Sequence, residues 1–150
     1  RDLRMSRGLG DVYKRQMGDY VANQVIKLMN KKGILVKGAR ILLLGITFKE
    51  NCSDIRNTKI VDIYSTLSEY TENIIVYDMW ANAAKVCHEY GIILTENSLE
   101  ELRGQFDAVV LGVAHDAFKN EDIRSFLKNK DGVVYDVKGI LDREIIDGRL

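Results

Sequence analysis

Short apolar runs alternate with amphipathic stretches along most of the chain. The first run, Ile41–Leu44, is continuous enough to predict a strand that is buried on both faces. An amphipathic helix follows at residues 60–67, with Asn57 or Thr58 as the expected N-cap. Because strands and helices continue to alternate at this spacing, the pattern predicts βαβ units and a parallel sheet.

The same pattern predicts further strands and helices after the first unit. Strands are expected at residues 73–78, 92–94, 106–113 and 133–137. Helices are expected at residues 81–90, directly after Ser98, and at residues 121–128, and the tail from 138 holds at most one helical turn. We therefore predict an α/β fold, a Rossmann-like parallel sheet of about five strands with flanking helices, preceded by an N-terminal helix.

The N-terminal part divides into two segments. Residues 1–16 show neither helical nor strand periodicity, and residues 11–16 resemble the translated end of a transposon sequencing adapter. We expect residues 1–16 to be such an artefact and to be disordered. From Met17 the apolar positions recur at helical spacing until Gly33, so residues 17–38 are a helix and its connector. The domain proper is residues 39–150.

Composition narrows the function. Lys and Arg together number 22, as do Asp and Glu, and the net charge is about −3 without residues 1–16. Neither nucleic acid nor a membrane is therefore an expected partner, and no apolar run reaches the roughly 20 residues of a membrane span. Cys52 and Cys87 show no metal-ligand spacing, so we expect no metal, free thiols and a cytoplasmic location. The polar, charged N-terminus is unlike a signal peptide.

The loop after the first strand carries the best candidate chemistry. It contains the cations Lys49 and Arg56, and it lies at the carboxyl end of a strand, where open α/β sheets bind ligands. Two cations near a helix start favour an anionic ligand such as a phosphate ester. Lys138, after the last predicted strand, reaches the same sheet edge as a third cation. Phe48 either packs in the core or covers a sugar or base.

Other polar residues at this edge have structural explanations that we favour. Asp78 ends the second predicted strand, where Rossmann domains bind a ribose, but the segment after Gly45 lacks a G-x-G-x-x-G run. We therefore interpret Asp78 as a turn or cap residue. His115 and Asp116 could form a base and its orienting partner, yet no nucleophile is apparent, so a loop-stabilising role is favoured. Cys52 has no histidine nearby in sequence, and we predict no catalytic residue.

A resemblance to a known family rests mainly on residues 44–58, LGITFKENCSDIRNT. This stretch resembles the signature loop of the nucleotide-sugar 6-dehydrogenases, the UDP-glucose/GDP-mannose dehydrogenase family. Later segments resemble the branch that acts on UDP-N-acetylhexosamines. They are residues 76–81, 88–91, 114–118 and 135–141. Residues 17–22 resemble the end of the long helix that joins the central and C-terminal domains of that family.

The resemblance implies that the chain is a fragment, with residues 39–150 as the UDP-sugar-binding domain. Phe48, Lys49 and Lys138 would contact the UDP-sugar, and Arg56 would reach toward NAD. The NAD-binding domain, the central dimerisation region and the cysteine nucleophile would lie upstream.

The complete enzyme would be a homo-oligomer that oxidises a sugar C6 alcohol to a uronic acid with NAD, for surface polysaccharide precursors. The alternative is a non-catalytic α/β module that binds another phosphorylated ligand or makes oligomer contacts.

Overall fold

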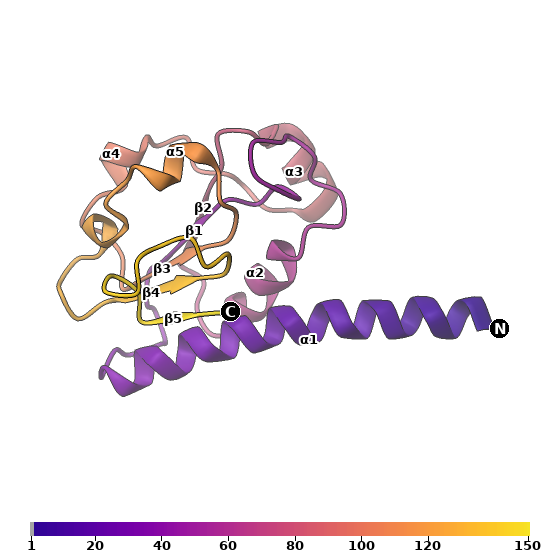
Figure 1. Cartoon of the computed structure of the whole chain (residues 1–150), viewed down its shortest axis with the longest axis horizontal. Coiled ribbons are helices and arrows are strands. Elements are labelled where there is room, and N and C mark those ends of the chain that lie inside the picture. The colour runs from indigo at the N-terminus through magenta and orange to yellow at the C-terminus, as the bar shows by residue number, and fades with distance from the viewer. Residues whose placement is uncertain (1) are drawn as a thin grey trace.

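The computed structural model describes the backbone of residues 2–150 and the side chains from residue 16 onward. Its centre is one five-stranded, all-parallel sheet with the order β2-β1-β3-β4-β5 (Figure 1). The strands are β1 Ile41–Leu44, β2 Ile74–Tyr77, β3 Ala108–Leu111, β4 Val133–Asp136 and β5 Gly148–Arg149. The predicted α/β fold with about five parallel strands is confirmed.

Helices cover both faces of the sheet. They are α1 Asp2–Lys31, α2 Ile60–Ser68, α3 Ala83–Tyr90, α4 Leu99–Leu102 and α5 Asp116–Lys119, with a 3₁₀ helix η1 at Ile123–Phe126. Strand residues alternate between two cores. Ile41 and Leu43 pack with the buried side chains of α1, α2 and α3, whereas Leu42 and Leu44 pack with those of α4, α5 and η1. This double cover explains the continuous apolar run in β1.

Helix α1 packs along α2, β4 and β5 (Figure 1). A Cβ atom at Gly18 would lie 2.5 Å from the Asp62 Cβ, so α1 and α2 approach each other at a distance that only glycine permits. The helix begins at Asp2, whereas we expected it to begin at Met17 and residues 1–16 to be disordered. No proline interrupts that stretch, and each residue added to an existing helix gains a backbone hydrogen bond.

Three local predictions of strands and helices were wrong. Residues 92–94 do not form a strand, because only Leu94 pairs with the sheet, in an isolated bridge to Val76. The region predicted as a helix at residues 121–128 holds only the short η1, preceded by α5. The fifth strand comes instead from the tail.

Asp147 explains the position of β5. Its carboxylate forms ion pairs with Lys32 at 2.5 Å and Arg124 at 3.1 Å, and it accepts a hydrogen bond from the Val134 N–H. These partners come from the turn after α1, from η1 and from β4, so they fix the tail against the sheet through contacts distant in sequence.

Two helix boundaries agree with the sequence signals. Helix α3 ends at Tyr90, followed by Gly91 in the left-handed conformation, and Ser98 forms a capping box with Glu101 at the start of α4.

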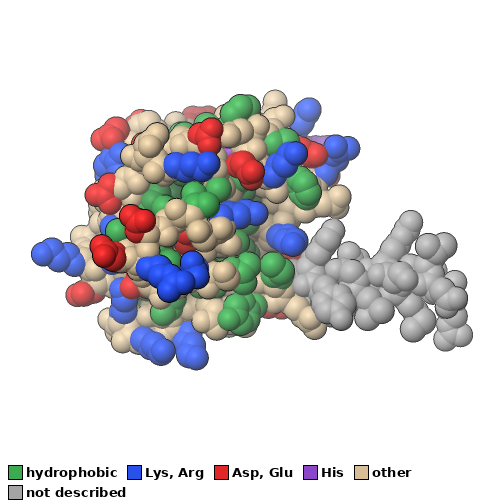
Figure 2. Space-filling model, viewed as in Figure 1, with side chains coloured by type: hydrophobic (Ala, Val, Ile, Leu, Met, Phe, Trp, Pro, Cys, Tyr) green, Lys and Arg blue, Asp and Glu red, His purple; other side chains and the backbone are tan. Residues whose placement is uncertain are grey.

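In the part of the chain that the structure describes, no helix is both long and apolar enough to cross a membrane. The face in Figure 2 carries Lys and Arg side chains interspersed with Asp and Glu.

Candidate functional site

The candidate site lies at the carboxyl ends of β2, β1 and β3, which are neighbours in the sheet. The loop of residues 45–59 leaves β1 here and leads into α2. Gly45 has φ of 91°, and a Cβ atom on it would lie 2.6 Å from the Val113 Cβ. The position therefore requires glycine, both for its backbone conformation and for the close approach of the segment after β3. This approach brings residues from three strand ends into contact.

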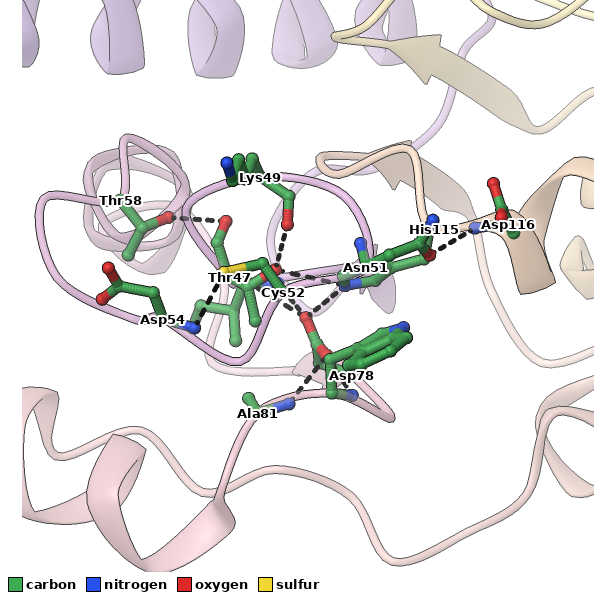
Figure 3. Close-up of polar contacts among 12 residues, drawn as sticks. Thr47, Lys49, Asn51, Cys52, Asp54, Thr58, Asp78, Ala81, His115 and Asp116 are labelled. Atoms are coloured by element: carbon green, nitrogen blue, oxygen red, sulfur yellow. Dashed lines mark hydrogen bonds and ion pairs between the residues drawn. The ribbon is translucent and has the colours of Figure 1, made fainter.

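A buried polar network joins these strand ends (Figure 3). The Asp78 side chain follows β2, His115 follows β3, and both are fully buried. The His115 Nε2 lies 3.0 Å from the Asp78 Oδ2 and 3.2 Å from the Thr47 Oγ1. Thr47, itself 1% exposed, follows β1. One residue from each of three adjacent strands therefore meets at this point.

Asp78 is the most heavily hydrogen-bonded member of the network. Its Oδ2 accepts from the N–H groups of Ile46 and Thr47, and its Oδ1 accepts from those of Trp80 and Ala81. Burial opposes its charge, but the hydrogen bonds from His115 and the backbone outweigh this and lower the pKa of Asp78. Its predicted role in the turn is confirmed, and the carboxylate also fixes the start of the loop after β1.

His115 fixes a second part of the same loop. Its Nδ1 accepts a hydrogen bond from the Asn51 N–H at 2.9 Å, and the Asn51 Oδ1 accepts from the Asp116 N–H at 3.1 Å (Figure 3). The predicted loop-stabilising role of His115 is confirmed. The Asp116 carboxylate pairs with Lys119 at 3.0 Å instead of orienting the imidazole. Cys52 accepts a hydrogen bond from the Asp54 N–H, a contact within the loop.

A small cavity of about 230 Å³ lies beside the loop and the start of α2. Lys49 and Lys138 both line it, together with Phe48, and Lys59 adds a third lysine. Among the ion pairs of the described residues, none involves these three lysines. The cavity thus combines three available positive charges with an aromatic ring that is 51% exposed. This combination suits an anionic ligand with an attached ring.

Lys138 reaches this cavity from a turn that is built like the one after β2. Asp136 ends β4, is fully buried, and accepts hydrogen bonds from the N–H groups of Lys138, Gly139 and Leu141. The carboxylates of Asp78 and Asp136 therefore each hold the turn that follows their strand. Such turns fix the backbone from which the Lys138 side chain extends.

The start of α2 also lines the small cavity. The prediction of Asn57 or Thr58 as the N-cap was wrong, because the N-cap residue is Lys59. The Thr58 Oγ1 still accepts from the Ile60 N–H at 3.3 Å, and Asn57 adopts a left-handed φ of 56°. Lys59 precedes the first helical residue and was not identified from the sequence. Its position directly after Thr58, in the first turn of the helix after β1, is the signal that could have identified it.

Arg56 lies elsewhere. It lines a separate, larger cavity of about 850 Å³ with Cys52, Lys85 and His88. Its side chain is 84% exposed and forms an ion pair with Asp54 at 3.0 Å, and the hydrogen bonds from Arg56 lower the pKa of Asp54 to about 2. The structure therefore brings Phe48, Lys49 and Lys138 together but does not bring Arg56 to the same cavity.

The described residues hold no cluster of histidine, cysteine and carboxylate side chains that could bind a metal ion. Nor do they provide the backbone of a dinucleotide site. The space beside Gly45, where the missing Cβ would allow a pyrophosphate to approach, is filled by Val113. The geometry at this edge therefore supports binding of an anionic ligand near the lysines.

Known proteins resemble this chain over most of its length. Residues 42–143 match the UDP binding domain of the UDP-glucose/GDP-mannose dehydrogenase family. The UDP-N-acetyl-D-glucosamine 6-dehydrogenases of Salmonella typhi and Pseudomonas aeruginosa are each 47% identical over 137 residues, which is 89% of this chain and 31% and 32% of those proteins. The chain thus spans about a third of the length of these relatives.

The fold also matches solved structures. The structure of the UDP-D-ManNAc dehydrogenase from Pyrococcus horikoshii superposes with a TM-score of 0.72 at 21% identity, over 89% of this chain and 30% of that one. The UDP-N-acetyl-mannosamine dehydrogenase Cap5O from Staphylococcus aureus does so with a TM-score of 0.64 at 22% identity, over 89% and 29%. The chain belongs to the UDP-glucose/GDP-mannose dehydrogenase family, and the three lysines of the small cavity lie within the part that matches the UDP binding domain of that family.

Proposed function

We propose that this chain is the UDP-sugar-binding part of an NAD-dependent UDP-sugar 6-dehydrogenase and that it binds its ligand without turnover when alone. The observation that carries the proposal is the small cavity with Lys49, Lys59 and Lys138 around it and Phe48 at its side. Three cations without ion-pair partners among the described residues are opposite in sign to a diphosphate and can bind it. The half-exposed ring of Phe48 offers a surface for the sugar or the base.

The names of the relatives support a substrate class. Two relatives at 47% identity are named as UDP-N-acetyl-D-glucosamine 6-dehydrogenases, so we propose a UDP-N-acetylhexosamine as the ligand. The complete protein would oxidise the C6 alcohol of this sugar to a uronic acid in the cytoplasm, for surface polysaccharide precursors. A homo-oligomer is the proposed assembly.

The proposed cofactor, NAD, would be bound mainly by a domain outside this chain. The residues present do not fit a complete dinucleotide site, because Val113 fills the space beside Gly45. Arg56 is the proposed contact from this chain, since its exposed side chain lines the larger cavity instead of the lysine cavity. We assign no chemical step to this chain.

Thermal unfolding with ligand tests the binding proposal. A single-site ligand at about 100 times its Kd stabilises a protein by about 2.7 kcal/mol, so UDP-N-acetylglucosamine in excess should raise the Tm of this chain. Inorganic pyrophosphate, which carries charge without uridine or sugar, should raise it less. Lys138→Ala should reduce the shift, because Lys138 lines the cavity. An unchanged Tm at millimolar UDP-sugar would contradict the proposal.

The upstream coding sequence distinguishes the enzyme from a non-catalytic binding module. A strand–helix unit with G-x-G-x-x-G and a glycine-flanked cysteine upstream would support the dehydrogenase. Their absence from the complete reading frame would leave a phosphate-binding module.

A further inference from the structure

The hydrogen bonds of His115 define where its proton lies. A backbone N–H can only donate, so the Nδ1 that faces the Asn51 N–H at 2.9 Å must be the acceptor and carries no proton. The proton of the neutral ring is then on Nε2, which faces the Asp78 Oδ2 at 3.0 Å. The geometry therefore assigns a neutral imidazole in the Nε2–H form.

The Thr47 hydroxyl connects the His115 ring to the backbone of Lys49 in the loop after β1. Its Oγ1 donates to the Lys49 carbonyl oxygen at 3.0 Å, which leaves a lone pair for the His115 Nε2–H at 3.2 Å. One ring nitrogen thus fixes Lys49 through Thr47, while the other fixes Asn51 directly (Figure 3). The segment of residues 47–51, which carries Phe48 and Lys49, is held at both ends by one imidazole.

We propose that His115 is a positioning residue for ligand binding: its neutral Nε2–H imidazole holds residues 47–51 so that Phe48 and Lys49 line the small cavity, and protonation of Nδ1 releases this segment. The role concerns UDP-sugar binding and so rests on the proposed function. Protonated Nδ1 would face the Asn51 N–H with a second donor, and the hydrogen bond between them would be lost. The Nδ1–H of the fully buried His115 ring would then have no acceptor, which is costly, so the loop must move.

The surroundings of His115 do not offer the second proton a new acceptor. The Asp78 carboxylate faces Nε2, which already carries a proton, and it accepts from four backbone N–H groups as well. The Asp116 carboxylate, the other charged neighbour, is paired with Lys119. The remaining neighbours are uncharged: Thr47 and Asn51 from the loop, and the rings of Phe118 and Trp80, whose centroids lie 5.6 Å and 6.2 Å from that of His115.

Nitrogen-detected NMR of the chain tests the assignment without any ligand. The sequence has two histidines, and the exposed His88 on α3 is an internal reference. At about pH 8 we expect His115 to show one unprotonated Nδ1 and one protonated Nε2, and His88 to show a mixture of tautomers. As acidification protonates the His115 ring, the Asn51 and Lys49 amide signals should change together with the ring signals. A proton on Nδ1 at the higher pH, or Lys49 and Asn51 signals that do not follow the His115 ring, would overturn the proposal.

Affinity for UDP-N-acetylglucosamine as a function of pH tests the positioning role. This ligand is the right probe because its diphosphate is esterified at both ends, whereas a terminal phosphate such as that of UDP titrates near about pH 6. We expect the wild-type affinity to fall roughly tenfold when acidification protonates His115. His115→Asn keeps an acceptor near the Nδ1 position and does not titrate, so its affinity should lose this pH dependence. His88→Gln is the matched control and should retain it.

The outcomes separate this inference from the proposed function. Binding that is equally pH-dependent in wild type and His115→Asn would overturn the positioning role while leaving UDP-sugar binding intact. A third outcome is that His115 has the expected tautomer and the Lys49 signals follow its protonation, but the chain does not bind UDP-N-acetylglucosamine at about pH 8. That result would contradict the proposed function alone. If His115→Asn does not fold, the wild-type ring and amide signals still decide whether protonation releases the loop.

Discussion

Lys49 and Arg56 lie in the same loop after β1, yet their charges are used differently. Lys49 lines the small cavity with two other lysines, and it forms none of the ion pairs found among the described residues. Arg56 lines the large cavity and is paired with Asp54 at 3.0 Å. A cation near a strand end is therefore available to a ligand only where no carboxylate of its own loop takes its charge.

The two halves of the loop also differ in how they are held. Residues 47–51 are tied to Asp78 and His115, which are both fully buried and come from other strands. Residues 52–56 are held largely by contacts within the loop, such as the bond from the Arg56 N–H to the Asp54 Oδ1, and by the Tyr90 hydroxyl, which donates to the Ile55 carbonyl. The first half is thus anchored to the buried network at the strand ends, and the second half is held by its own contacts and by α3.

Asp78→Asn should produce the largest effect. The amide cannot replace a carboxylate that accepts five hydrogen bonds in a buried site, so we expect a loss of about 2–4 kcal/mol in the free energy of unfolding. Denaturant unfolding measures it. Asp54→Asn is the matched control in the second half of the loop and should change the midpoint little. Equal losses in the two variants would remove the distinction between the halves.

Acidification should reveal the same difference. The pKa of Asp78 is lowered in the folded state, so its contribution to stability is fully present above the unfolded value of about 3.9 and is lost as the pH falls through the folded value. Asp147 acts in the same direction, because hydrogen bonds from Lys32, Val134 and Arg124 outweigh its burial and lower its pKa.

Urea unfolding at a series of pH values below about 5 should show the wild type losing stability more steeply than Asp78→Asn. Parallel curves would contradict the role of Asp78.

Lys59→Ala and Lys85→Ala sharpen the comparison of the two cavities. Lys59 lines the small cavity and Lys85 the large one. Removal of Lys59 should weaken binding of UDP-N-acetylglucosamine by about five- to tenfold, since one charge facing the diphosphate is lost. Removal of Lys85 should leave the affinity of this chain unchanged. Calorimetric titration measures both, and the reverse order would place the ligand in the large cavity.

The strand β1 and the candidate site after it could be predicted from the sequence, because the signals for both were local. One short stretch, residues 41–56, holds the apolar run of β1, the glycine after it and the two cations. This stretch indicated both the strand and the candidate ligand edge. The separation of Arg56 from Lys49 also has a local signal, the carboxylate of Asp54 two residues before the arginine.

Other features depend on contacts between distant residues. Sequence analysis favoured structural roles for His115 and Asp78 but could not show that they touch, because they are 37 residues apart and meet only when β1, β2 and β3 are aligned. The strand β5 was missed for the same reason. Asp147 draws it to the sheet through Lys32 and Arg124, and nothing in the residues around it has strand periodicity.

The central claim is that Lys49, not Arg56, supplies the charge that holds the ligand on this chain. Calorimetric titration of UDP-N-acetylglucosamine into the wild type, Lys49→Ala and Arg56→Ala tests it directly. We expect Lys49→Ala to weaken binding by at least about tenfold and Arg56→Ala to leave the Kd within about twofold of the wild type. A Kd that rises for Arg56→Ala and stays unchanged for Lys49→Ala would contradict the account.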